Sequence, residues 1–119
     1  MKLTFRDIFK IYLILTVLIG CASTEKIKET DPAELVAQGN SFLKKGQFDQ
    51  AIAYFNRAIE INPRYDTAYN NRGFVYYIKG QYDKAIADCT KVIEINPKYA
   101  LAYKNRATAY FYKRQYEKA

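Results

Sequence analysis

The sequence contains no histidine and no tryptophan, and its only cysteines are Cys21 and Cys89. Histidine is the side chain most often used as a general base or a metal ligand, so its absence removes the commonest basis for catalysis near neutral pH. No paired carboxylates, metal-ligand cluster, nucleophile with a base or phosphate-binding loop takes its place. The two thiols stand in such different contexts that a disulfide is not expected. We therefore predict no enzymatic activity, no cofactor and no metal site.

Long runs of like charge are also absent, although the formal net charge is +7. A basic balance is compatible with nucleic acid or anionic lipid. However, acidic and basic residues are interspersed, and no nucleic-acid-binding motif is present. We predict that nucleic acid is not a partner.

No apolar run is long enough to span a bilayer, which needs about 20 residues. The longest run, Ile11 to Ile19, follows a basic start and ends at the small residue Gly20. This order is typical of a secretory signal peptide over residues 1–20. The alternative is an uncleaved anchor that extends back to Leu3, but the charged residues Arg6 and Lys10 argue against it.

The end of this segment, Leu18-Ile19-Gly20-Cys21, resembles the lipobox of bacterial lipoproteins. The resemblance implies that Cys21 is lipidated and becomes the mature N-terminus, the alternative being an ordinary free cysteine. Two or more acyl chains hold a protein on a membrane, whereas one gives marginal binding. Ala22 follows rather than Asp, which by the same resemblance favours the outer membrane in a Gram-negative cell. Residues 21–30 then form a lipidated end and a polar tether.

The remainder of the chain repeats itself with a period of about 34 residues. Gly46 to Ala53 returns almost unchanged as Gly80 to Ala87, and Ile59 to Pro63 returns as Ile93 to Pro97. A third copy begins at Ala100. Repeats of this length cannot bury their own apolar faces, so they stack and present an extended surface.

Each repeat is predicted to be a pair of helices. Apolar residues at helical spacing, with glycine, proline and Asn-Pro as stop signals, place helices at 32–45, 48–62, 67–79, 82–96 and 101–113. Asp31 and Pro32 are a strong start for the first of them. A sixth helix is expected to begin near Tyr116.

The pattern resembles that of tetratricopeptide repeat proteins. The family's positions are occupied in the first repeat by Leu35, Gln38, Gly39, Phe42, Ala51, Phe55, Ala58 and Pro63. In the second they are occupied by Tyr69, Arg72, Gly73, Tyr76, Ala85, Cys89, Val92 and Pro97. In the third they are Tyr103, Arg106, Ala107, Tyr110 and Ala119.

This resemblance implies an all-α fold, an α-solenoid of antiparallel helix pairs over residues 31–119. The repeats span 32–65, 66–99 and an incomplete 100–119. Cys89 departs from the family's aromatic residue and faces the core of its helix. We interpret it as a buried small hydrophobe rather than a reactive thiol.

In this family the first helix of each pair lines a concave groove that holds peptides or a partner's helix. By resemblance, the groove residues are Val36, Asn40, Leu43, Lys44, Asn70, Asn71, Phe74, Tyr77, Ile78, Lys104, Asn105, Thr108, Phe111 and Tyr112. Asparagine amides suit main-chain groups, and aromatic rings suit apolar side chains. The alternative is that Phe74, Tyr77 and Phe111 merely pack repeat on repeat.

Some family members clamp the terminal carboxylate of heat-shock chaperones with two asparagines and three basic residues. Asn40 and Asn71 match the asparagines, but Val36, Leu101 and Asn105 occupy the basic positions. Without those cations a terminal carboxylate would be held poorly, so we do not expect this ligand.

The third helix pair is incomplete, so Ala109, Tyr110 and Tyr116 are expected to lack a partner helix. Three explanations stay open. The helix from Leu101 acts as a simple terminal cap, two chains associate there, or the sequence is a fragment of a longer protein, which is the favoured explanation. The function expected overall is a lipid-anchored adaptor that gathers other envelope proteins of a bacterium. The alternatives are an activity C-terminal to residue 119 and a secreted or periplasmic enzyme accessory.

Overall fold

The computed structural model describes residues 4–10 and 31–119, which belong to two separate compact units. In the first, residues 5–10 form a short helix. Oδ2 of Asp7 accepts from the amide of Thr4 over 3.3 Å and so caps the first turn, and it also accepts from the Thr4 hydroxyl over 2.7 Å. Phe5, Ile8 and Phe9 of this helix are exposed. The predicted lipobox, its Cys21 and the tether lie outside the described residues.

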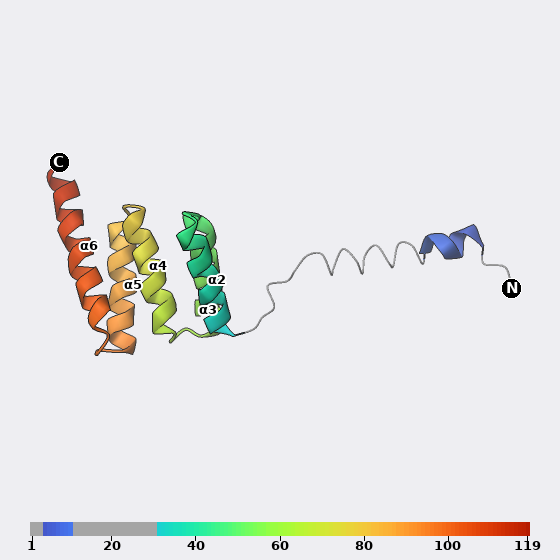
Figure 1. Ribbon diagram of the computed structural model, residues 1–119, viewed down its shortest axis with the longest axis horizontal. Coiled ribbons are helices and arrows are strands. Elements are labelled where there is room, and N and C mark those ends of the chain that lie inside the picture. Colours follow the sequence, from blue (N-terminus) through green and yellow to red (C-terminus); the bar gives the residue numbers. More distant parts are fainter. Residues whose placement is uncertain (1–3, 11–30) are drawn as a thin grey trace. The chain divides into compact units, whose positions relative to one another are not determined.

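The second unit consists of five helices joined by short turns (Figure 1). They are α2 (Pro32–Lys44), α3 (Phe48–Ile61), α4 (Asp66–Ile78), α5 (Tyr82–Ile95) and α6 (Ala100–Lys118). No strand occurs in the part of the chain that the structure describes. The predicted all-α fold is confirmed, and the first four helices begin and end within a residue or so of the predicted positions.

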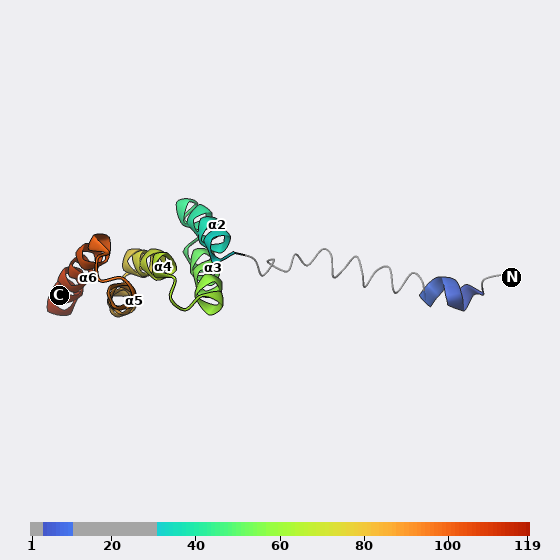
Figure 2. The ribbon, with the colours of Figure 1, turned by 90° about the horizontal axis from the view of Figure 1, so that it is seen from below.

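The helices form a two-layer stack. Each packs against the next along the chain, and α4 additionally contacts both α2 and α6. The odd and even helices therefore separate into two layers, which Figure 2 shows with the helices close to end-on. This is the solenoid that the repeat predicts.

Local chemistry sets the helix ends. Oδ1 of Asp31 accepts a hydrogen bond of 3.0 Å from the amide of Ala33, so the predicted cap is present. The turns within the pairs use Gly46 at φ 72° and Gly80 at φ 74°, a backbone conformation that costs other residues about 1–2 kcal/mol.

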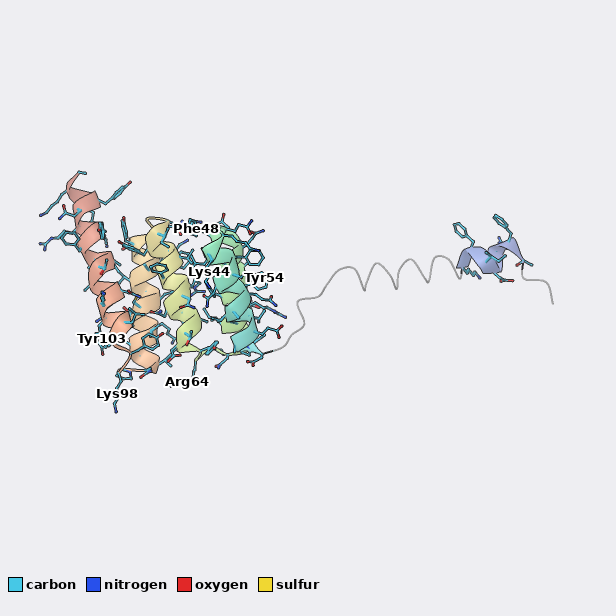
Figure 3. All side chains as sticks on the ribbon, viewed as in Figure 1. Lys44, Phe48, Tyr54, Arg64, Lys98 and Tyr103 are labelled. Carbon is cyan, nitrogen blue, oxygen red and sulfur yellow. The ribbon has the colours of Figure 1, made fainter. Side chains whose placement is uncertain are left out.

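The loops between pairs are built alike. Oδ1 of Asn62 accepts from the amide of Arg64 over 3.1 Å, and Oδ1 of Asn96 accepts from the amide of Lys98 over 3.2 Å. Both contacts are Asx turns, which fix the chain direction before the next helix. Figure 3 labels Arg64 and Lys98, which lie along the same edge of the stack.

Helix α6 corrects one prediction. It runs without a break from Ala100 to Lys118, whereas a turn after Lys113 and a new helix near Tyr116 were expected. The reason is Arg114, which stands where the first two repeats have Gly46 and Gly80. Arginine enters the left-handed region only at a cost, so the helix continues through this position.

The core is made of small and medium side chains at the helix contacts. Ala51, Phe55, Ala58, Val75 and Val92 are each 0% exposed. Because Ala109 is also 0% exposed and packs with Ala85 and Ile86 of α5, the prediction that it lacks a partner helix was wrong. It faces the preceding repeat. Tyr110 and Tyr116, at 53% and 78%, are exposed as predicted.

Candidate partner-binding site

Four asparagines form a chain of hydrogen bonds across α2, α4 and α6. Nδ2 of Asn71 donates to Oδ1 of Asn40 over 2.9 Å. Nδ2 of Asn105 donates to Oδ1 of Asn70 over 3.3 Å, and Nδ2 of Asn70 donates to Oδ1 of Asn71 over 3.4 Å. Each amide keeps further donor or acceptor capacity. The chain of amides therefore fixes the first helices of the three repeats relative to one another.

An aromatic cluster lies towards the C-terminal ends of α4 and α6. Tyr77 is at its centre, with ring centroids 5.6 Å from Tyr112, 6.0 Å from Tyr82 and 6.5 Å from Phe74. Phe111 meets Tyr112 edge to face at 5.4 Å. Phe74, Phe111 and Tyr112 are respectively 42%, 58% and 42% exposed, so this cluster combines ring packing with an accessible apolar surface.

A pocket of about 190 Å³ lies between these features. Its walls come from α4 and α6, and Ala85 and Cys89 of α5 form its floor. The lining residues are Gly73, Phe74, Tyr77, Ala85, Cys89, Lys104, Asn105 and Thr108. Five of these eight residues are predicted groove residues, which the structure thus brings together in one concavity.

The pocket owes its depth to Cys89. In the first repeat the corresponding residue is Phe55, and its Cε1 is 2.5 Å from where a Cβ on Gly39 would lie. At Gly73 the nearest atom of Cys89, its Sγ, is 3.7 Å from the equivalent position. A small side chain therefore replaces a ring that would occupy this volume.

The Cys89 thiol is neutral under ordinary conditions. It is 1% exposed, and burial raises its pKa to about 11, with the nearby Asp88 charge adding to the effect and Arg106 opposing it. A thiolate, the reactive form, is therefore scarce near neutral pH. This agrees with the interpretation of Cys89 as a small hydrophobe.

Arg72, which precedes Gly73 in α4, joins three helices. Its Nε and Nη2 donate to the two carboxylate oxygens of Asp88 over 2.8 and 2.7 Å, and its Nη1 donates to Oδ1 of Asn56 over 2.7 Å. The guanidinium also lies between the rings of Tyr69 and Tyr76, at 5.5 and 5.8 Å from their centroids. The hydrogen bonds with Asp88 raise the pKa of Arg72.

Sequence reasoning missed this function of Arg72. The available signal was its occurrence, with Arg106, at a position where the family has leucine. Arg106 repeats part of the arrangement: its Nη1 donates to Oγ1 of Thr90 over 3.4 Å, and it lies 5.7 Å from the Tyr103 ring centroid. Each of these two half-buried arginines therefore ties its repeat to the preceding one, Arg72 through Asn56 and Arg106 through Thr90.

The predicted groove residues differ in accessibility. Val36 and Asn70 are each 5% exposed, so they support the surface from beneath. Leu43 packs against the first core cluster, and Lys44 is exposed at the end of α2. Ile78 is 42% exposed. The binding role of the whole set stays a prediction.

The charge at the pocket is positive. Lys104 is exposed on its rim and makes no ion pair within the described residues. Two acids of α5 are engaged in other ion pairs, Asp88 with Arg72 and Asp83 with Lys113, each at 2.7 Å. The fourteen predicted groove residues include two lysines and no acid.

Among the described residues, no group of three or more acidic, cysteine or histidine side chains is placed to hold a metal. Within residues 4–10 and 31–119, no helix combines the length and hydrophobicity needed to cross a bilayer.

Family patterns match three overlapping parts of the chain. A pattern described as TPR repeat matches residues 39–78, and two described as tetratricopeptide repeat match residues 67–99 and 89–119. A comparison with curated proteins gave no match.

Solved structures with the same fold include three informative examples. The second TPR domain of Spaghetti (RPAP3), bound to the HSP90 peptide SRMEEVD, is 26% identical with a TM-score of 0.70, over 73% of this chain and 81% of that chain. The TPR2B domain of yeast Sti1, in a complex with an Hsp70 peptide, is 28% identical with a TM-score of 0.68, over 73% and 70%. MamA is 32% identical with a TM-score of 0.70, over 72% of this chain and 47% of MamA.

Proposed function

Residues 39–119 are built of tetratricopeptide repeats, and from this premise we propose that the protein is a lipid-anchored adaptor of the bacterial cell envelope. Its groove binds a peptide or a helix of another envelope protein, and it has no catalytic role. The observation that carries the proposal is the pocket between α4, α5 and α6.

The groove supports binding in two ways. Exposed rings at Phe74, Phe111 and Tyr112 offer apolar contact area, and Asn71 and Asn105 offer amides suited to main-chain groups. The structures of the RPAP3 and Sti1 domains, which hold chaperone peptides, support peptide binding as the general function of this fold.

The ligand differs from a chaperone's free carboxylate. Of the residues at the three basic clamp positions, Val36 is 5% exposed, Leu101 is apolar, and Asn105 hydrogen-bonds to Asn70. None of them supplies the cation that a carboxylate needs. The groove is therefore suited to an internal segment of a partner.

The anchor and the location rest on the sequence before residue 31. The apolar run Ile11–Ile19 and the lipobox ending at Cys21 support lipidation and export, and Ala22 favours the outer membrane in a Gram-negative cell.

The groove is tested by capturing cross-linked partners from envelopes with three forms of the full chain. These are the wild type, the double variant Asn71→Ala/Tyr77→Ala, and a control double variant Lys91→Ala/Lys98→Ala. Both control residues are exposed and lie outside the pocket lining. The first double variant is expected to lose a partner that the wild type and the control retain, with unchanged helix content by circular dichroism. Equal capture by all three forms would place the site elsewhere.

The anchor is tested with Cys21→Ser. This variant is expected to remain uncleaved and unlipidated, because the thiol that accepts the lipid is missing. Mass spectrometry of the N-terminal peptide shows whether the signal peptide has been cleaved and whether lipid is attached. Normal maturation with retention in the membrane fraction would contradict the lipoprotein proposal.

A further inference from the structure

The first and second repeats share one backbone plan but differ in what fills the space between neighbouring first helices. In the first repeat, Phe55 is 0% exposed and its ring lies directly on Gly39. In the second repeat, the glycine is kept as Gly73, but Cys89 replaces the ring. The volume that becomes available is the pocket of about 190 Å³, which opens on the groove.

The size and lining of this pocket define its occupant. A cavity of about 150 Å³ lined by apolar side chains is large enough to bind benzene. The floor here is apolar, because it consists of Ala85 and Cys89, and Gly73 in the adjoining wall has no side chain. The rings of Phe74 and Tyr77 form one wall. One medium or large apolar side chain fits this space.

The rim adds polar and charged contacts on one side. Asn105 uses Nδ2 towards Asn70, which leaves its Oδ1 available to accept from a main-chain amide. Lys104 carries a charge that no acid in the described residues neutralises through an ion pair. An acidic residue next to the apolar side chain would complement this charge.

We infer that the pocket at Cys89 is the specificity subsite of the groove, and that it takes one apolar side chain from an internal peptide segment with an acidic neighbour. This inference rests on the proposed function and adds the chemistry of the partner to it. Cys89 sets the specificity by being small, and its thiol takes part in no reaction.

The direct test fills the pocket with the residue that the first repeat uses. Cys89→Phe is compatible with the backbone, because Gly73 leaves room for a ring as Gly39 does for Phe55. Cys89→Ala is the matched control, since it keeps the pocket open. Thr108→Phe narrows the pocket from the α6 side and provides a second test if Cys89→Phe does not fold.

The probe is a phage-displayed library of random dodecapeptides, selected on the full chain carrying Cys21→Ser. The most enriched peptides are then synthesised with blocked termini and titrated against each variant. We expect a motif with one fixed apolar residue beside Asp or Glu. Affinity is expected to fall at least about tenfold in Cys89→Phe and to stay within about twofold in Cys89→Ala, because only the first removes the space for the apolar anchor. Lys104→Gln is expected to weaken binding about two- to fivefold, the effect of one exposed ion pair.

Two results would overturn the inference. In the first, the enriched peptides bind the wild type, Cys89→Phe and Thr108→Phe with equal affinity but no longer bind Asn71→Ala/Tyr77→Ala. The groove would then bind peptides without using this subsite. The other is that no peptide is enriched. The envelope capture experiment decides the proposed function independently of either result.

Discussion

The first and second repeats occupy the same positions in the same fold, yet their interiors are stabilised differently. Repeat 32–65 packs the ring of Phe55 onto Gly39. Repeat 66–99 instead has the small Cys89 and an ion pair between Arg72 and the buried Asp88. The positions equivalent to that pair in the first repeat hold Gln38 and Tyr54. The turns, glycines and alanines that shape the solenoid are common to both. The two repeats differ at many positions, and those of Cys89, Arg72 and Asp88 change how the interior is filled and paired.

The largest difference between the repeats is expected on truncating the two corresponding core residues. Phe55→Ala removes a fully buried ring and should lower the free energy of unfolding by about 3–5 kcal/mol. Cys89→Ala removes one sulfur atom beside an existing pocket and should cost about 1 kcal/mol. Urea unfolding followed by circular dichroism measures both values. Similar losses would mean that the two repeats are packed alike.

The next effect concerns the ion pair that only the second repeat has. Arg72→Gln, which introduces the residue of the first repeat, leaves Asp88 buried and unpaired and should cost about 3 kcal/mol. Adding Asp88→Asn removes the uncompensated charge and should restore most of that loss. Arg106→Gln is the matched control and should cost less than about 1 kcal/mol, because its hydrogen bond to Thr90 is long, at 3.4 Å.

A double-mutant cycle gives the coupling between Arg72 and Asp88. If the effects of Arg72→Gln and Asp88→Asn simply add, the pair does not stabilise the second repeat in the way described.

A smaller effect is expected from adding one methyl group to each buried helical glycine. A Cβ at position 39 would lie 2.5 Å from Cε1 of Phe55, whereas at position 73 its nearest neighbour is Cβ of Asp88 at 3.1 Å. Gly39→Ala should therefore destabilise the fold by about 1–3 kcal/mol. Gly73→Ala should change stability by less than about 1 kcal/mol, because the higher helix propensity of alanine offsets the tighter contact. Thermal unfolding of the two variants side by side tests this order, and the reverse order would contradict it.

The smallest effect extends the comparison to the third repeat. Gly46→Ala forces a left-handed conformation on a residue with a side chain and should cost about 1–2 kcal/mol. Arg114→Ala alters an exposed residue in the interior of α6 and should change stability by less than about 0.5 kcal/mol. Chemical denaturation distinguishes the two. A comparable loss at both positions would mean that Arg114 has a structural role of its own.

The sequence was sufficient to predict the helices because its signals are local and repeated. Asp31 with Pro32 starts α2, and glycine or Asn-Pro follows the end of each helix from α2 to α5. The error at Arg114 came from carrying the period forward across a position where the residue required for the turn had changed. Ala109 was misassigned because its face depends on which neighbouring repeat its helix packs against.

The site was predicted less completely for a related reason. The resemblance to the repeat family assigned Phe74, Tyr77 and Asn105 to the groove, and all three line the pocket. It also assigned Val36 and Asn70 to that surface, although they are buried. Burial there depends on how closely the first helices approach one another, which no single helix encodes. The pocket depends on the sizes of residues from α4, α5 and α6 together. The sequence therefore identified Cys89 as a core residue but not the pocket that its small side chain leaves open.

The most direct test of the central claim is site-specific photo-cross-linking in the cells that make the protein. A photoreactive amino acid is placed at Thr108, on the rim of the pocket, or at Lys98, an exposed loop residue outside the pocket lining. If the groove between α4 and α6 binds an envelope protein, the photoreactive residue at position 108 yields a discrete adduct, and Cys89→Phe abolishes that adduct. The photoreactive residue at position 98 yields none. The same adducts from both positions, or an adduct from Lys98 alone, would contradict the assignment of this groove as the binding site.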